Sequence, residues 1–267
     1  MKTCQLLTAL LFGFLLSHAS QAALVASWEL EEGSGTTTTE SVTSTTSSAF
    51  GTGVSWSTDT SGAESDSSIT FPNTADGHIK TGLNANALGI AGSGAKTIVG
   101  WFKTSSTEQQ MFFGYSPSNG TGAGQDLRLG HDASGFMRFE VSSGFAVNSS
   151  ITINDGQWHK LAVIINPNDT TDNVEFYLDG SILSPTSSNG RLINTLGSTA
   201  TSNFNQVILG NGNPLSDTQS WNGLIDEVRV YDSALTLGEL DALSAIPEPA
   251  ASALGVLGML AFLRRRR

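Results

Sequence analysis

The chain reads Val174-Glu175-Phe176-Tyr177-Leu178-Asp179-Gly180 at its clearest strand. Valine, phenylalanine and leucine alternate with glutamate and tyrosine, so the apolar side chains fall on one side of an extended segment. Asp179-Gly180 follows at once and is a residue pair that suits a tight hairpin turn. The stretch therefore predicts a β-hairpin with one buried face, and it favours an all-β fold.

Similar segments recur along the chain, separated by turn-forming residues such as Asn154-Asp155-Gly156 and Asn211-Gly212. Short strands with these turns between them are typical of two antiparallel sheets packed as a β-sandwich or jelly roll. We expect Trp101, Val163 and Phe176 to face its interior. The other predicted strands are Leu24–Leu30, Ser68–Phe71, Thr97–Lys103, Gln110–Tyr115, Asp126–Gly130, Phe136–Val141, Ser150–Ile153, His159–Ile165, Gln206–Leu209 and Leu224–Tyr231.

Two segments depart from the strand pattern. Thr236–Ser244 predicts a short helix, because Thr236 can cap it and Glu239 completes a capping box. Residues 36–48 are nearly all threonine and serine. We interpret them as a mobile surface loop, with disorder as the alternative.

Residues 1–22 have the order of a secretory signal peptide. Lys2 is followed by an apolar stretch from Leu6 to Leu16 and then by small residues that end at Ala22. A charged residue, then an apolar stretch, then small residues is the order typical of a segment that is cleaved during export. We expect cleavage after Ala22 and an exported mature chain.

The other end of the chain carries Pro247-Glu248-Pro249, an uncharged run from Ala250 to Leu263, and Arg264–Arg267. The prolines stop any preceding helix. The 14 uncharged residues make about 21 Å of helix, which is marginal against a hydrocarbon core of roughly 30 Å. Arginines that stay in the cytoplasm would place the main domain outside.

This tail resembles the PEP-CTERM sorting signal of Gram-negative bacteria that make exopolysaccharide. In that family a membrane enzyme, exosortase, is thought to recognise and cleave the tail. The resemblance implies that residues 247–267 form an address outside the domain, with Pro247, Glu248 and Pro249 as the sorting motif. It also implies exosortase as a partner, transient anchoring by the apolar helix, and delivery to the cell surface or beyond.

Removal of both ends makes the protein strongly acidic. The whole chain has 13 basic and 24 acidic side chains, and residues 23–246 keep 8 and 23 of them, a formal charge of −15. Such a charge disfavours binding to nucleic acid and to anionic lipid. Cys4, the only cysteine, lies in the signal peptide, which excludes a disulfide, a thiol nucleophile and a cysteine zinc site from the mature protein.

Three stretches carry a second resemblance: LVASWELEEGSG (24–35), DGQWHKLAV (155–163) followed by VEFYLDG (174–180), and NGLIDEVRVYD (222–232) with Ala234-Leu235. Their order and spacing resemble the LamG-like jelly roll of the concanavalin A-like lectin/glucanase superfamily. The resemblance covers nearly all of residues 24–245 and implies a two-sheet antiparallel sandwich over residues 23–246. The family often continues after Gly35 with Asp-Ser-Ser-Gly-Asn, and here the Thr/Ser run stands instead.

This fold hosts both sugar binders and glycosidases, so it does not decide the activity. A retaining glycosidase needs two carboxylates about 5–5.5 Å apart. The laminarinase-like members place them with a Glu-x-Asp-x-x-Glu strand, and neither Glu175–Asp179 nor Asp226–Asp232 has that spacing. We therefore expect a non-catalytic protein.

The resemblance also implies a structural calcium ion, since related jelly rolls often hold one where the first and last strands meet. Asp226, with Glu29 or Glu31, would then supply the side-chain oxygens that calcium prefers. The alternative is that these acids are solvated edge residues or pair with Arg229.

Tryptophan rings are platforms on which sugar rings stack, and Trp56 and Trp221 stand in polar, turn-rich surroundings. They are the candidate ligand-binding residues, with packing under a loop as the alternative.

The leading interpretation is an exported surface or matrix protein that binds polysaccharide. A structural or adhesive protein without a glycan site and a polysaccharide-cleaving enzyme remain as alternatives.

Overall fold

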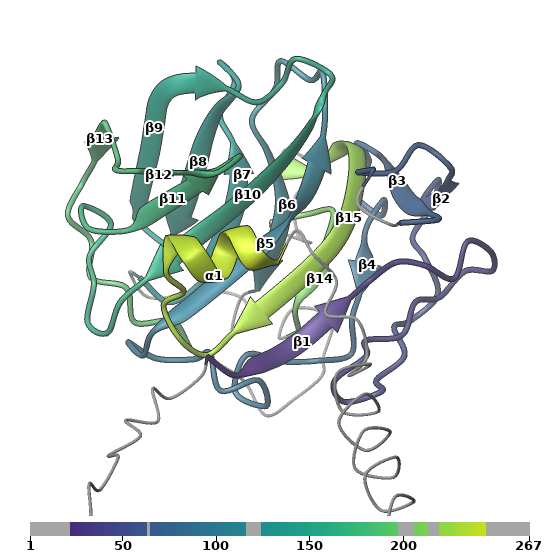
Figure 1. Ribbon diagram of the computed structural model, residues 1–267, viewed down its shortest axis with the longest axis horizontal. Coiled ribbons are helices and arrows are strands. Elements are labelled where there is room, and N and C mark those ends of the chain that lie inside the picture. Colours follow the sequence, from purple (N-terminus) through teal and green to yellow (C-terminus); the bar gives the residue numbers. More distant parts are fainter. Residues whose placement is uncertain (1–21, 63–64, 116–123, 197–205, 213–218, 244–267) are drawn as a thin grey trace, which may run out of the picture.

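The protein is an all-β sandwich of two antiparallel sheets in a computed structural model that describes residues 22–62, 65–115, 124–196, 206–212 and 219–243 (Figure 1). Each predicted strand segment overlaps a strand, and the sandwich prediction is confirmed. The predicted signal peptide, except for Ala22, and the predicted sorting tail lie outside the described residues.

The first sheet has eight strands, in the order β12-β11-β10-β5-β15-β3-β2, with β1 also paired to β15. Strand β15 is its centre, because it pairs with β5 along one side and with β3 and then β1 along the other. The strands are β1 (Leu24–Trp28), β2 (Ser55–Ser57), β3 (Ser68–Pro72), β5 (Lys96–Lys103), β10 (Trp158–Ile165), β11 (Glu175–Leu178), β12 (Ser181–Leu183) and β15 (Asn222–Tyr231).

The second sheet has seven strands, in the order β13-β9-β8-β7-β6-β14-β4. Long neighbouring strands β6 to β9 form its middle, and each pairs antiparallel with the next. The strands are β4 (Ile79–Lys80), β6 (Gln110–Tyr115), β7 (Leu127–His131), β8 (Phe136–Val141), β9 (Gly144–Thr152), β13 (Ser187–Ser188) and β14 (Ile208–Leu209).

The hairpin predicted at Asp179-Gly180 joins β11 to β12. Asp179 and Gly180 both have positive φ, 45° and 91°, as the tightest hairpin turns require. The Asp179-Gly180 turn therefore forms as predicted.

One apolar core fills the space between the sheets. Val163 and Phe176 are fully buried in it, as predicted. The prediction for Trp101 was wrong. Successive side chains of a strand point to opposite faces, and Phe102 occupies the core. Trp101 consequently lies half-buried on the outer face of the eight-stranded sheet, opposite Lys160 and Asp226 in register.

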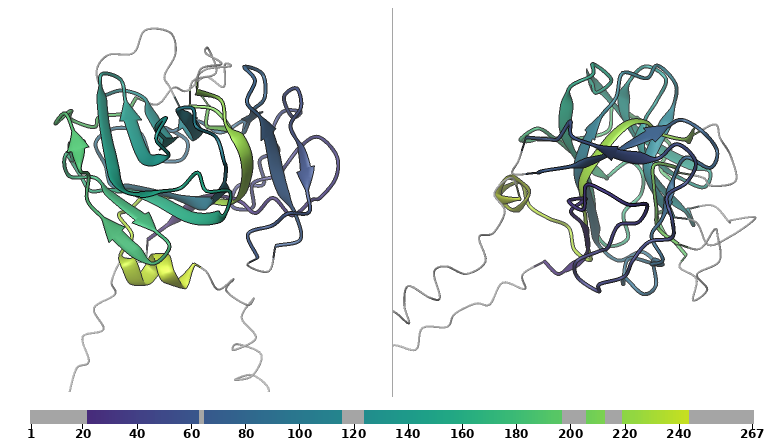
Figure 2. Two further views of the ribbon diagram at one scale, coloured as in Figure 1. Left: turned by 90° about the horizontal axis from the view of Figure 1, so that it is seen from above. Right: turned by 90° about the vertical axis from the view of Figure 1, so that its right-hand side faces the viewer.

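The predicted helix is α1 (Leu237–Ala242), with the expected capping box of Thr236 and Glu239. Leu240 is buried against the outer face of the eight-stranded sheet, beside Ala162 and Tyr177. Lys160 Nζ donates to the Leu240 carbonyl at 2.5 Å. Figure 2 shows α1 lying across that face, away from the seven-stranded sheet.

The Thr/Ser run has a defined path, which argues against disorder. Glu40 is fully buried, and its carboxylate accepts hydrogen bonds from the backbone N–H groups of Ser27, Val42 and Thr43 at 2.6–2.9 Å. Backbone donors of this kind satisfy a buried carboxylate. Glu40 thus ties the run to β1.

The alternation on β5 leads to a stability prediction. Phe176→Ala should lose about 3–5 kcal/mol, because it empties a fully buried site between the sheets. Trp101→Ala should lose less, since the ring lies half-buried on the outer face. Urea denaturation of both variants measures the difference, and a larger loss for Trp101→Ala would contradict this placement.

Candidate functional site

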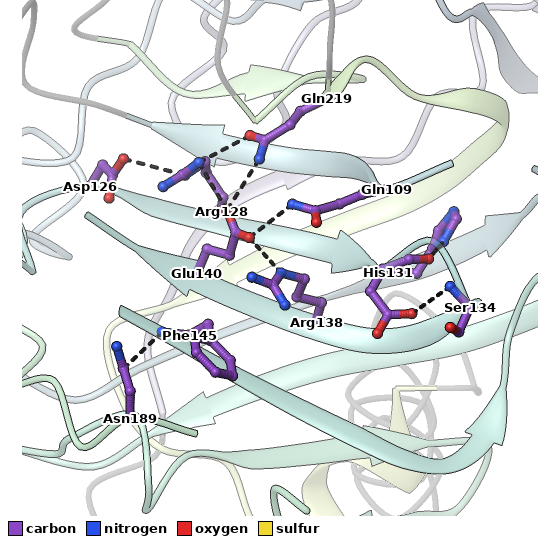
Figure 3. A network of polar contacts seen from close by, with 11 residues as sticks. Gln109, Asp126, Arg128, His131, Ser134, Arg138, Glu140, Phe145, Asn189 and Gln219 are labelled. Carbon is purple, nitrogen blue, oxygen red and sulfur yellow. Dashed lines mark hydrogen bonds and ion pairs between the residues drawn. The ribbon is translucent and has the colours of Figure 1, made fainter. Parts of the chain in front are cut away.

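The outer face of the seven-stranded sheet carries a row of polar and aromatic side chains. Arg128 of β7 lies opposite Glu140 of β8, and Glu140 lies opposite Phe145 of β9. Directly paired residues of antiparallel strands share a face. Their neighbours Leu129 and Phe139 point into the core, so the row faces outward (Figure 3).

Glu140 is the centre of this row. Its Oε2 lies 2.9 Å from Arg128 Nη1, and its Oε1 accepts from Arg138 Nε. Gln109 Nε2 donates to Oε1 at 2.9 Å, and Gln219 Nε2 donates to Oε2 at 3.2 Å. Gln219 Oε1 in turn accepts from Arg128 Nη1 at 3.1 Å. We call these residues, together with Asp126, the Glu140 network; its members are Gln109, Asp126, Arg128, Arg138, Glu140 and Gln219.

Asp126 completes the network at the start of β7. Its Oδ2 lies 3.3 Å from Arg128 Nε, and the residue is 8% exposed. Burial raises the pKa of this carboxyl above its ordinary value, and the Arg128 charge opposes the rise. Arg128 therefore lies between two carboxylates.

Phe145 adds an aromatic surface beside the network. The Arg138 guanidinium carbon lies 5.0 Å from the centre of the Phe145 ring, a distance typical of a cation–π contact. Asn189 accepts a hydrogen bond from the Phe145 backbone N–H at 3.1 Å and donates to Ser143 at 3.0 Å. The half-buried ring is thereby held against Arg138 (Figure 3).

Asp226, the predicted calcium ligand, lies at the point on β15 where pairing with β3 ends and pairing with β1 begins. A bulge follows it, with Glu227 at a φ of 46°. Asp226 is fully buried. Ser61 N donates to its Oδ2 at 3.1 Å, while Oδ1 has no hydrogen-bond partner among the described residues. Burial raises the pKa of Asp226 to about 6.

The two other predicted calcium ligands differ in their placement. Burial raises the pKa values of Asp226 and Glu227, and the charge of Glu31 adds to both rises, so Glu31 lies in the same region. Glu29 is exposed, and its carboxylate accepts from Ser41 Oγ at 3.2 Å. Within the described part of the chain, no three His, Cys, Asp or Glu side chains converge as a metal site. An unpartnered buried carboxylate oxygen beside a second acid nevertheless suits a hard cation.

The two predicted stacking tryptophans have different surroundings. Trp221 is fully buried, with its ring 5.6 Å from that of Phe112 and 6.0 Å from that of Phe102, edge to face. It is a core residue with no face open to a sugar. Trp56 is half-buried, packs on Phe50, and donates from Nε1 to the Gly35 carbonyl at 3.1 Å.

The predicted sorting motif, Pro247, Glu248 and Pro249, lies outside the described residues, as does the apolar run that follows it. Among the residues described, no helix has the length and apolar character needed to cross a membrane.

Sequence reasoning missed the Glu140 network. One signal was present: Arg128, Arg138 and Glu140 alternate with leucine, methionine and phenylalanine inside two predicted strands. That alternation indicates a polar outer face but leaves open which strands are neighbours. Phe145 was missed because the strand that carries it was predicted to begin only at Ser150.

Comparison with protein families identifies the class. The family model of the concanavalin A-like lectin/glucanases superfamily matches residues 64–241. The match covers more than half of the chain, and the chain belongs to this family. No curated protein matches.

Several solved structures share the fold at low identity. Domain 4 of AbnA, an extracellular GH43 arabinanase from Geobacillus stearothermophilus in complex with arabinotriose, is 18% identical, with a TM-score of 0.57 over 84% of this chain and 98% of that one. The Trypanosoma rangeli sialidase bound to the inhibitor DANA is 13% identical, with a TM-score of 0.56 over 83% and 32%. The binding domain of botulinum neurotoxin serotype G is 15% identical, with a TM-score of 0.53 over 83% and 50%.

The chain thus spans nearly the whole arabinanase domain, about a third of the sialidase and half of the neurotoxin fragment. At these identities the likeness shows the fold. Such neighbours include both carbohydrate-binding and glycosidase proteins.

The Glu140 network should matter for stability. Glu140→Gln should lower the free energy of unfolding by about 3 kcal/mol, because it leaves two largely buried guanidinium groups with one fewer carboxylate. Asp76→Asn removes the same charge from an exposed residue and serves as the control. Equal, small losses in urea denaturation would contradict the central place of Glu140.

Proposed function

We propose that this protein is an exported, non-catalytic carbohydrate-binding protein that contacts polysaccharide through the outer face of its seven-stranded sheet. The observation that carries the proposal is the Glu140 network beside the Phe145 ring, on a fold of the lectin/glucanase family. The arabinanase domain with bound arabinotriose supports a sugar ligand for this fold.

The chemistry of the face suits a sugar. A sugar presents an apolar C–H face and a rim of hydroxyl groups, and such ligands bind where an apolar surface adjoins a few fixed polar groups. Phe145 offers the apolar surface. Arg138 and Gln109 offer polar groups whose positions Glu140 fixes at 2.9 Å or less.

The same network favours binding over hydrolysis. Both oxygens of Glu140 already accept hydrogen bonds, each from a guanidinium and an amide. A nucleophile or proton donor would have to give these up. The second nearby acid, Asp126, contacts the same Arg128 through its Oδ2, so both carboxyl groups of the network are engaged with arginine, which disfavours their use as the acid pair of a retaining mechanism.

A glycan array with the purified chain tests this function. Phe145→Ala should reduce binding at least tenfold, because the stacking surface is lost. Trp56→Ala is the matched control, since Trp56 is the other half-buried candidate platform. Reducing-sugar release from a bound glycan would point to an enzyme, and no binding to any glycan would favour the structural or adhesive alternative.

We propose in addition that residues 1–22 direct export and that residues 247–267 sort the protein through an exosortase-type enzyme to the cell surface or exopolysaccharide matrix. Deleting residues 247–267 should leave the free energy of unfolding within about 1 kcal/mol. The same deletion should abolish sorting, as cell fractionation measures. A large loss of stability would show that the tail belongs to the core.

Calcium at Asp226 and Glu31 is the proposed structural cofactor. The ion would pair with the orphaned Asp226 Oδ1 and offset the repulsion between Asp226, Glu227 and Glu31. A cation that binds only the native state stabilises it by about 2.7 kcal/mol at 100 times its dissociation constant.

The melting temperature should therefore rise by several degrees in millimolar calcium and fall with chelator, while magnesium should do much less. Asp226→Ala should abolish the response. Asp172→Ala, which removes the same charge at an exposed carboxylate bound to Gly190 N, should keep it. Equal responses to both metals would mean general charge screening, and an unchanged response in Asp226→Ala would place the site elsewhere.

A further inference from the structure

The charges of the Glu140 network cancel. Arg128 and Arg138 carry two positive charges, and Asp126 and Glu140 carry two negative charges when ionised. Each arginine contacts at least one of these carboxylates, at 3.3 Å or less. The site therefore has no surplus positive charge with which to attract an anion.

Within the described part of the chain, the network keeps both hydrogen-bond donors and a hydrogen-bond acceptor that it does not use internally. Among the described residues, Arg138 uses only Nε for hydrogen bonds, so its Nη1 and Nη2 remain as donors. Gln109 is fixed with Nε2 toward Glu140, because an ionised carboxylate can only accept. Among the described residues the Gln109 carbonyl oxygen then has no donor, and its side chain shares Glu140 Oε1 with Arg138.

A sugar hydroxyl matches this pair of groups, because it donates one hydrogen bond and accepts others. A carboxylate accepts only. It could bind to Arg138, but it would also lie near the Gln109 carbonyl oxygen and the Glu140 carboxylate, which repel it.

The rest of the domain adds to this discrimination. Residues 23–246 carry a formal charge of −15, which opposes the approach of a polyanion, most strongly at low ionic strength. We infer that the Glu140 network selects neutral polysaccharide chains over chains that carry uronate or other anionic sugars. This inference rests on the proposed carbohydrate-binding function and names its ligand class.

The test is an array of neutral and uronate-containing glycans, including arabinotriose, polygalacturonate and fully methyl-esterified polygalacturonate. It is probed with the full chain in buffer without added calcium. The neutral members should bind at least tenfold more strongly than the anionic ones. Esterification should raise the affinity for galacturonan. Added salt should reduce the difference in affinity between the neutral and the anionic glycans.

Variants separate the site from the overall charge. Arg138→Ala should weaken binding to neutral glycans at least fivefold. Lys103→Ala, which removes the same charge from the opposite sheet where Lys103 pairs with Asp59, should leave it unchanged. Stronger binding to the uronate members would overturn the inference while leaving the carbohydrate-binding function intact. Neutral binding unaffected by Arg138→Ala would overturn the assignment to this site, and no binding at all would overturn the function itself.

Discussion

Burial of one face of each sheet determines what every second residue of a strand can do. Phe139 points into the core, so Arg138 and Glu140 on either side of it point out. The same rule puts Phe102 inside and Trp101 outside. The polar site thus exists because the core beneath it is apolar and closely packed, and a strand that slipped by one residue would bury its charges.

Local features of the fold could be predicted from the sequence. The Asp179-Gly180 turn and the Thr236 capping box each depend on adjacent residues, and both form as expected. Trp101 could not be placed, because apolar residues on both sides of it hide the alternation. The defined path of residues 36–48 could not be predicted for a different reason: the buried Glu40 carboxylate that organises them meets Ser27, 13 residues earlier in the chain.

The candidate site was harder to predict than the fold. The Glu140 network draws residues from β7, from β8, and from the segments just before β6 and β15, which only strand pairing brings together. By contrast, Asp226 and Glu31 could be associated in advance, because the resemblance implied that the first and last strands meet. The structure pairs β1 with β15 and puts the charge of Glu31 close enough to act on Asp226. The third acid of that region, Glu227, could not be predicted, because the bulge that places it near Asp226 is visible only in the structure.

The first and last described residues, Ala22 and Leu243, both pack in the small apolar cluster around α1. That cluster covers the outer face of the eight-stranded sheet, whereas the Glu140 network occupies the outer face of the other sheet. A tether joined to either end would attach the domain on the side of the eight-stranded sheet, opposite the Glu140 network. Phe145 and Arg138 would then point away from the attachment, without any hinge or rearrangement of the sandwich.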